Sequence, residues 1–225
     1  MFRFPLLAVA VVGGVAACGS APDPLGNLSA SAIASRAVAG TEAASSMHVQ
    51  GEGTSGGQTM SFDLNVAGSK GCSGTVTESK AGTFKLVKLG TSLWVSPSDT
   101  FYRAEAARGA VVPLAALSGK YLRETPGKSA LASFGSMCQL NPLLTALASE
   151  AAKFTKGTVS VTGGVRTLRL SRGSTVMDVT DAASPRVVSI DAPGAARYSF
   201  SGYGSAAPVS APPARAVTDG SRFGF

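Results

Sequence analysis

The sequence is poor in the residues from which most metal and catalytic sites are built. Its 225 residues include one His, one Trp and three Cys, and only 15% of them are charged. A single His cannot supply the His clusters that hold zinc, and no Cys-x-x-Cys pair occurs. No calcium-binding loop spacing is present either. We therefore expect no metal site and no cofactor.

Motifs for catalysis are also missing. There is no Gly-x-Ser-x-Gly elbow, and the Gly-Lys pairs at Gly119 and Gly127 lack the upstream glycine of a phosphate-binding loop. His48 is expected on the solvent side of a strand, opposite its apolar neighbours. The 13 acidic residues are spread along the chain, and nothing selects an acid–base pair. We expect no catalytic residues and no enzyme activity.

The charge balance is basic but diffuse. Lys and Arg total 20, which gives a formal net charge of +7. These residues are scattered singly, without runs and without interleaved aromatics, so the pattern argues against nucleic-acid binding. A modest excess of this kind favours attraction to anionic lipid head groups.

The N-terminus lacks an apolar run long enough to cross a bilayer. Met1-Phe2-Arg3 supplies a positive charge, and residues 6–15 form an apolar stretch of about ten residues, the length of a signal sequence. Val15-Ala16-Ala17-Cys18 follows and resembles the lipobox of bacterial lipoproteins. This resemblance implies removal of residues 1–17, acylation of Cys18 and anchoring at the extracytoplasmic face of the cell membrane. The alternative is an ordinary signal peptide with a chance cysteine.

The other two cysteines form an even pair. In an oxidising compartment Cys72 and Cys138 are expected to bond, closing a loop of about 66 residues. The chain-entropy model gives such a bond roughly 4 kcal/mol of stabilisation. Two buried free thiols are the alternative.

Composition divides the rest of the chain into three parts. Residues 18–26 contain Pro and Gly and form a short tether. Residues 27–204 form one folded domain. Residues 205–225 are rich in Ala and Pro and read as irregular.

Hydrophobic periodicity changes twice along the domain. A helix capped by Ser29 or Ser31 is expected to run to about residue 45. Period-2 alternation then predicts strands, a middle region reads as helical, and strands return after residue 156. Asn141 and Pro142 are expected as cap and first residue of the clearest helix. The expected strands cover residues 47–51, 60–66, 73–78, 83–89, 93–95, 158–162, 167–171, 175–180, 186–191 and 197–203, with 121–122 as an isolated extended piece and 129–137 as a helix.

This order predicts an α+β fold with a single large, curved antiparallel sheet of about ten strands. One sheet face is apolar in this interpretation. The helix around Leu143, Leu144 and Leu147 is the candidate to cover it.

Several segments resemble the LolA-like lipoprotein-carrier superfamily, and within it the actinobacterial LppX/LprG-type lipoproteins. The lipobox is followed by an Ala/Ser-rich helix that leads into residues 46–51, and a polar-alternating hairpin continues through Phe62. Near the other end, Tyr198-Ser-Phe-Ser-Gly-Tyr-Gly precedes a Pro-containing segment and Asp219-Gly220. The likeness covers most of the chain in element order, and its specific residues lie at the two ends.

The resemblance implies a half-barrel whose concave face meets helices around an apolar cavity for acyl chains. It also implies a monomeric carrier or presenter of lipids, with an acyl-chain or glycolipid ligand. Arg166 or Arg172 at the rim could meet a phosphate. Candidate lipid-binding residues are Met60, Phe62, Leu64, Phe84, Leu86, Phe134, Leu143, Leu144, Leu147, Leu168 and Leu170.

Alternation alone does not separate a ligand cavity from a packed core. The same apolar faces would suit a solid domain that acts as an interaction or sensor module for a protein or cell-wall partner. A cavity favours the carrier, and a dense interior favours the interaction module.

Overall fold

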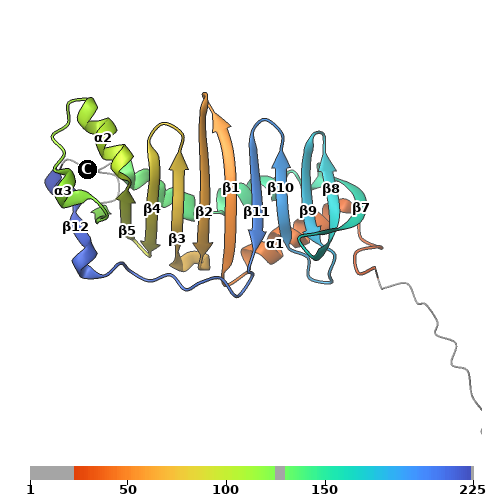
Figure 1. Cartoon of the computed structure of the whole chain (residues 1–225). Helices are drawn as coiled ribbons and strands as arrows, with labels where there is room; N and C mark the ends of the chain where they lie inside the picture. Colours follow the sequence, from red (N-terminus) through yellow and green to blue (C-terminus); the bar gives the residue numbers. More distant parts are fainter. Residues whose placement is uncertain (1–22, 125–129, 224–225) are drawn as a thin grey trace, which may run out of the picture.

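The computed structural model describes residues 23–124 and 130–223. Their strands form one open sheet of 12 strands in the order β12-β6-β5-β4-β3-β2-β1-β11-β10-β9-β8-β7 (Figure 1). All neighbours are antiparallel except β12 and β6, which are parallel. The strands are β1 (Met47–Ser55), β2 (Gln58–Val66), β3 (Gly71–Glu78), β4 (Gly82–Leu89), β5 (Ser92–Pro97), β6 (Tyr121–Glu124), β7 (Thr155–Thr162), β8 (Val165–Arg172), β9 (Thr175–Thr180), β10 (Val187–Ala192), β11 (Ala196–Ser201) and β12 (Val217–Asp219).

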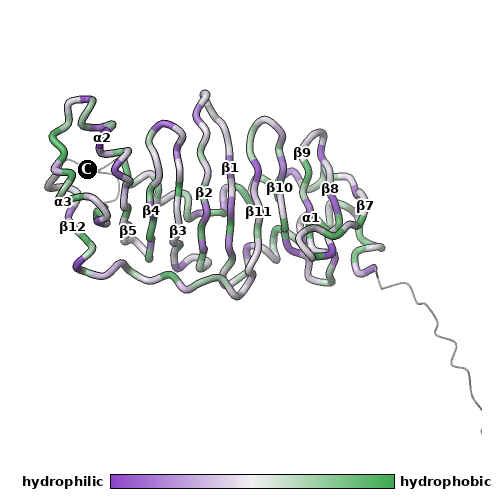
Figure 2. Tube along the Cα trace, in the orientation of Figure 1, coloured by the Kyte–Doolittle hydropathy of each residue, from purple (hydrophilic) through white to green (hydrophobic). Residues whose placement is uncertain are grey.

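The strands have one apolar and one polar face because their side chains alternate. Hydropathy changes from residue to residue along each strand (Figure 2). The register aligns apolar residues across the sheet, with Val49 of β1 opposite both Leu64 of β2 and Phe200 of β11. The α+β class and the single large antiparallel sheet predicted from the sequence are confirmed.

Helices cover the apolar face. The α-helices of the described residues are α1 (Ala30–Glu42), α2 (Asp99–Ala107), α3 (Leu114–Leu117) and α4 (Asn141–Ser149). The 3-10 segments are η1 (Gly68–Lys70), η2 (Ala130–Cys138), η3 (Ala151–Lys153), η4 (Ala214–Ala216) and η5 (Gly220–Phe223); η1 connects β2 to β3, and η4 and η5 flank β12. The long helix α1 lies behind β9 and β10, and η2 lies behind β3, β4 and β5 (Figure 1).

Helix α1 begins where the sequence predicts. The Ser29 side chain accepts a hydrogen bond from the Ala32 backbone N–H, which satisfies one of the free donors of the first turn. Its buried residues are Ile33, Ala34, Ala37, Val38 and Thr41, one stripe of the helix.

Three local features differ from the sequence expectations. Asn141 is the first residue of α4 and not its cap: Leu140 is the cap, without a side-chain hydrogen bond. The helix expected before it is a 3-10 segment, η2. Sequence analysis missed β12, which pairs with β6 through three residues and is too short to show a period.

The core is one continuous cluster between the sheet and the helices. Phe84 of β4 illustrates it, because its ring centroid lies 4.6 Å from that of Phe134 in η2 and 5.3 Å from that of Phe101 in α2. Aromatic pairs at such distances add to the stabilisation from buried area.

The predicted signal peptide, residues 1–17, and Cys18 lie outside the described residues. Among the described helices, none combines the length and the apolar character needed to span a bilayer.

Candidate functional site

A hollow of about 730 Å³ opens at one end of the sheet, between strand ends and helices. We call this the mouth. Its sheet side is formed where β1 begins, β2 ends, β3 begins and β4 ends, and its helix side by the end of α1 and the η2–α4 junction. Apolar lining comes from Met47, Val66, Leu140 and Leu144. Three of these, Met47, Val66 and Leu144, also belong to the buried core cluster, so the mouth adjoins the apolar interior.

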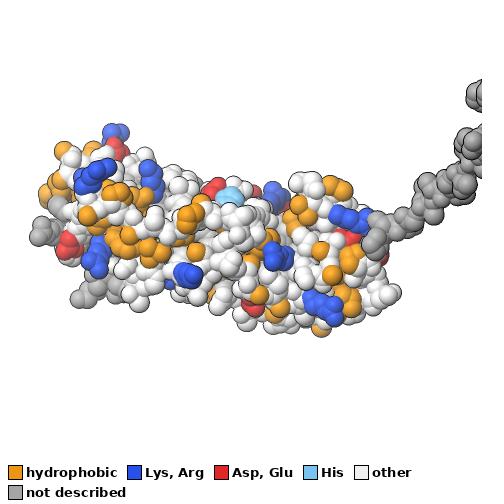
Figure 3. Space-filling model, turned by 90° about the horizontal axis from the view of Figure 1, so that it is seen from below, with side chains coloured by type: hydrophobic (Ala, Val, Ile, Leu, Met, Phe, Trp, Pro, Cys, Tyr) orange, Lys and Arg blue, Asp and Glu red, His pale blue; other side chains and the backbone are white. Residues whose placement is uncertain are grey.

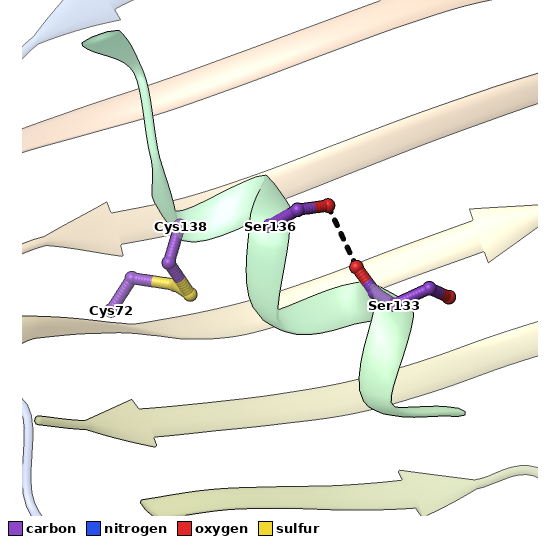
Figure 4. The surroundings of a disulfide bond; sticks show 4 residues. All are labelled: Cys72, Ser133, Ser136 and Cys138. Carbon is purple, nitrogen blue, oxygen red and sulfur yellow. Dashed lines mark hydrogen bonds between the residues drawn. A yellow bond between two sulfur atoms is a disulfide. The ribbon is translucent and has the colours of Figure 1, made fainter. Parts of the chain in front are cut away.

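A disulfide fixes the helix side of the mouth to the sheet. Cys72 of β3 and Cys138, the last residue of η2, are bonded, with their Cα atoms 5.5 Å apart (Figure 4). Just before it, Ser136 Oγ donates to the Ser133 carbonyl at 2.7 Å and tightens the same segment. The disulfide expected from the cysteine pair is therefore present, and Cys138 itself lines the mouth.

The sheet side of the mouth needs glycine at Gly71. A Cβ atom there would lie 1.9 Å from the Lys88 carbonyl oxygen, and its φ of +151° is unfavourable for other residues. The close approach of β3 and β4 at this point brings Lys88 to the rim, next to Lys70.

The mouth carries both signs of charge with an excess of positive charge. Lys70 is exposed, Lys88 is half-buried, and Glu42 at the end of α1 also lines the hollow. Within the described part of the chain, no carboxylate lies within ion-pair distance of either lysine. Both ammonium groups are thus available to an anionic group at the rim.

The candidate lipid-binding residues lie together in the core cluster. Five of them are almost completely buried: Leu64, Phe84, Leu86, Leu168 and Leu170. Phe134, Leu144 and Leu147 come from the helical layer, and Met60, Phe62 and Leu143 are partly buried at its margin. Of the whole set only Leu144 lines the mouth. Contact with a ligand stays a prediction for all of them.

The two rim arginines proposed from the sequence already have carboxylate partners. Arg166 Nε donates to Asp181 Oδ2 at 2.6 Å. Arg172 Nη1 donates to Glu150 Oε2 at 2.8 Å, and its guanidinium lies 5.8 Å from the centroid of the Phe154 ring. Neither lines the mouth, so Lys70 and Lys88 are the better placed cations, and sequence analysis missed them because rim position depends on strand pairing.

A second hollow, of about 530 Å³, lies on the polar face of the sheet. Side chains from β1, β2, β8, β9, β10 and β11 surround it, with Ser61, Ser189 and Ser199 among them. Asp178 accepts two hydrogen bonds from Arg169, at 3.0 and 3.3 Å, and one from Ser189, at 3.2 Å. The Asp178 carboxylate raises the pKa of Arg169. Both arginines of this groove, Arg169 and Arg197, are thus paired with carboxylates, and the three carboxylates of its lining outnumber them by one.

His48 lies on the polar face, as the alternation predicts, in a chain of hydrogen-bonding groups. Its Nε2 is 2.7 Å from Asp63 Oδ1, and its Nδ1 is 3.4 Å from Ser201 Oγ. Gln50 donates to the other Asp63 oxygen at 2.8 Å, and this bond, together with the one from His48, lowers the pKa of Asp63. The order Ser–His–Asp is that of a hydrolytic triad.

The geometry of these three residues differs from that of a hydrolytic triad. The Ser–His distance is longer than a nucleophile–base hydrogen bond, which is about 2.6–3.2 Å. None of Ser201, His48 and Asp63 lines either hollow described above. We interpret the hydrogen bonds of Ser201, His48 and Asp63 as a cross-strand network that joins β1, β2 and β11.

Comparison with solved structures identifies the fold. The crystal structure of LprF from Mycobacterium bovis superimposes with a TM-score of 0.55 over 82% of this chain and 96% of that chain, at 13% identity. The lipoprotein LppX of Mycobacterium tuberculosis gives 0.50 over 80% and 97%, at 14% identity. The chain shares its fold with these two mycobacterial proteins.

The resemblance to LppX/LprG-type lipoproteins seen in the sequence is thereby confirmed at the level of the fold. No family model and no curated sequence matches the chain. At such low identity the LprF/LppX fold carries over, and the residues of the mouth must be argued on their own.

Proposed function

We propose that this protein is a lipid-anchored envelope lipoprotein that carries or presents amphiphilic lipids at the extracytoplasmic face of the cell membrane. The observation that carries the proposal is the mouth, a hollow that adjoins the apolar core between sheet and helices. The lipobox-like segment ending at Cys18 and the LprF/LppX fold support it.

The mechanism is partition of acyl chains out of water. Each methylene that moves from water to an apolar environment contributes about 0.8 kcal/mol. A hollow of about 730 Å³ falls in the range of small-molecule sites. Leu144 and Leu140 would contact the acyl chain of the ligand. The ammonium groups of Lys70 and Lys88 would bind its phosphate or carboxylate head group. No bond is made or broken, so the proposal needs no catalytic residue, metal or cofactor.

The test is binding of a fluorescent fatty acyl probe to the purified mature chain, with native mass spectrometry to detect lipid that co-purifies. Thr145 lies in α4, is exposed and lines the mouth, so Thr145→Trp should obstruct the hollow and weaken probe binding about tenfold or more. Ala148→Trp is the matched control, because Ala148 is exposed on the same helix but does not line the mouth.

Equal affinity of the two variants would show that the probe binds elsewhere. A clean apoprotein that takes up no probe would remove the carrier function and favour the packed interaction module instead.

A further inference from the structure

Strand pairing places the mouth and the β7–β8 turn at the same end of the sheet. The mouth lies where β1 begins. Each strand from β1 through β11, β10, β9, β8 and β7 is antiparallel to its neighbour, so strand direction alternates along the sheet. The beginning of β8 and the end of β7 therefore lie at the same end of the sheet as the beginning of β1. We call it the mouth end, and Figure 3 views the molecule from it.

The β7–β8 turn exposes valine on both faces of its hairpin. Val161 is 71% exposed and is paired with Arg166, whereas Val165 is 42% exposed and is paired with the next residue of β7, so the two side chains point to opposite faces. A hairpin that only covers a core needs one apolar face. The Gly163-Gly164 turn between them has positive φ at both residues and adds no side chain to the tip.

The chain enters the domain beside the beginning of β7, on the same edge strand as the β7–β8 turn but toward its other end. The Lys156 ammonium of β7 donates to the carbonyl oxygens of Leu25 and Gly26 at 2.7 and 3.0 Å, and Leu25 is buried. Cys18 lies five positions before Asp23, a stretch that spans at most roughly 17 Å when extended. Because 12 strands at about 4.8 Å make a sheet roughly 50 Å wide, an acyl group on Cys18 holds the β7 edge near the bilayer and not the β12 edge.

The charge of the mouth end suits an anionic lipid surface. Lys70 and Lys88 flank the hollow, Arg186 directly precedes β10, and Arg166 near the beginning of β8 is paired with Asp181. Figure 3 shows Lys and Arg side chains scattered among hydrophobic ones in this view. The segment after β11 runs along the same strand ends toward β12 (Figure 1), and its residues 205–213 carry no charge.

We propose that the mouth end docks on the outer surface of the cell membrane, with the β7–β8 turn inserted among the lipid head groups and the mouth opening toward the bilayer. This inference rests on the proposed function and deepens it, because it names the source from which the ligand enters. Basic residues are attracted to anionic lipid head groups, and exposed apolar side chains insert among the lipids. An acyl chain would then pass between bilayer and hollow without crossing bulk water.

The test places an environment-sensitive label at the turn. In the mature acylated chain, Val161→Cys carries an NBD group, and the protein is reconstituted into vesicles of phosphatidylcholine and phosphatidylglycerol with or without doxyl-labelled lipid. Cys72 and Cys138 are bonded to each other, so the new thiol is the reactive one. We expect a blue-shifted emission and quenching of about twofold or more by the doxyl lipid.

Val111→Cys is the matched control. Val111 is 93% exposed and lies between α2 and α3, on the β5 side of the sheet and far from β7. Its label should remain unshifted and unquenched. A Val161 label that is quenched no more than the Val111 label overturns the docking proposal.

Docking and carriage can fail separately. If the acyl probe binds the protein but the Val161 label is not quenched, the carrier function stands and docking is wrong. If the label is quenched but no probe binds, docking stands and the carrier function is wrong. Where both hold, Val161→Ser with Val165→Ser should slow probe transfer from vesicles about tenfold and leave binding of free probe unchanged; equal transfer rates would overturn the inference.

Discussion

Thr41 shows at the scale of one residue how α1 is fixed to the sheet. Its hydroxyl donates to the Ala37 carbonyl at 2.8 Å and accepts from the Val187 N–H at 3.0 Å. The Tyr203 hydroxyl donates to the Val187 carbonyl at 2.5 Å, and burial raises the pKa of Tyr203 to about 12. Thr41 is fully buried, and together the two side chains bond both the N–H and the carbonyl of Val187 at the beginning of β10.

We predict that Thr41→Val lowers the free energy of unfolding by about 1–3 kcal/mol, because it leaves the Val187 N–H buried without a partner. Thr41→Ser keeps the hydroxyl and should retain most of the stability. Urea denaturation of the three proteins measures the difference. If Thr41→Val and Thr41→Ser lower the free energy of unfolding equally, the hydrogen bond from the Val187 N–H contributes nothing to stability.

At the scale of elements, the helical layer is joined to the sheet in two ways. Helix α1 continues directly into β1 and packs on β9 and β10. The η2–α4 segment follows residues 125–129 and is tied to β3 by the Cys72–Cys138 bond. The second attachment borders the mouth, so it controls how far η2 and α4 can move from the strand ends.

Replacing both Cys72 and Cys138 by Ala should lower the free energy of unfolding by about 2–5 kcal/mol, since the bond spans 66 residues. Chemical reduction of the wild-type protein should produce the same shift, which denaturant titration with and without reductant measures. A wild-type protein that titrates two free thiols when unfolded without reductant would contradict the bond.

At the scale of the whole molecule, the β7–β8 turn and the attachment of the N-terminal segment lie on the same edge strand, the turn at its end and the attachment at its beginning. The β7–β8 turn and the mouth lie at the same end of the strands, and the N-terminal segment joins the domain beside β7. A lipid anchor at Cys18 would therefore act on orientation as well as on location, because a short tether limits which part of the domain can reach the bilayer.

Cys18→Ala should move the protein from the membrane fraction to the soluble fraction, because two acyl chains anchor firmly and the basic surface alone binds weakly. Fractionation followed by labelling with a clickable palmitate measures both location and acylation. If the Cys18→Ala variant remains in the membrane fraction, another feature holds the protein there.

Much of the architecture was readable from local patterns. Alternation such as that of Met60, Phe62 and Leu64 identifies strands and their buried face, because the period of a strand is fixed at two. Very short strands cannot be predicted in this way. Strand β12 pairs with β6 through only three residues, too few to show an alternating pattern. The helical cap at Leu140 also escaped prediction, because it uses no side-chain bond.

The mouth could not be found in the sequence, because Met47, Lys88 and Leu144 are distant along the chain and meet only after the sheet and helices pack. Strand register decides which residues stand at a sheet end, and register depends on every pairing between them. The chain alone thus determines the lipobox-like cysteine, the two-faced strands and the cysteine pair, since these depend on neighbours and composition. Only the tertiary structure decides where the hollow lies and which lysines flank it, because those positions are set by contacts between elements far apart in sequence.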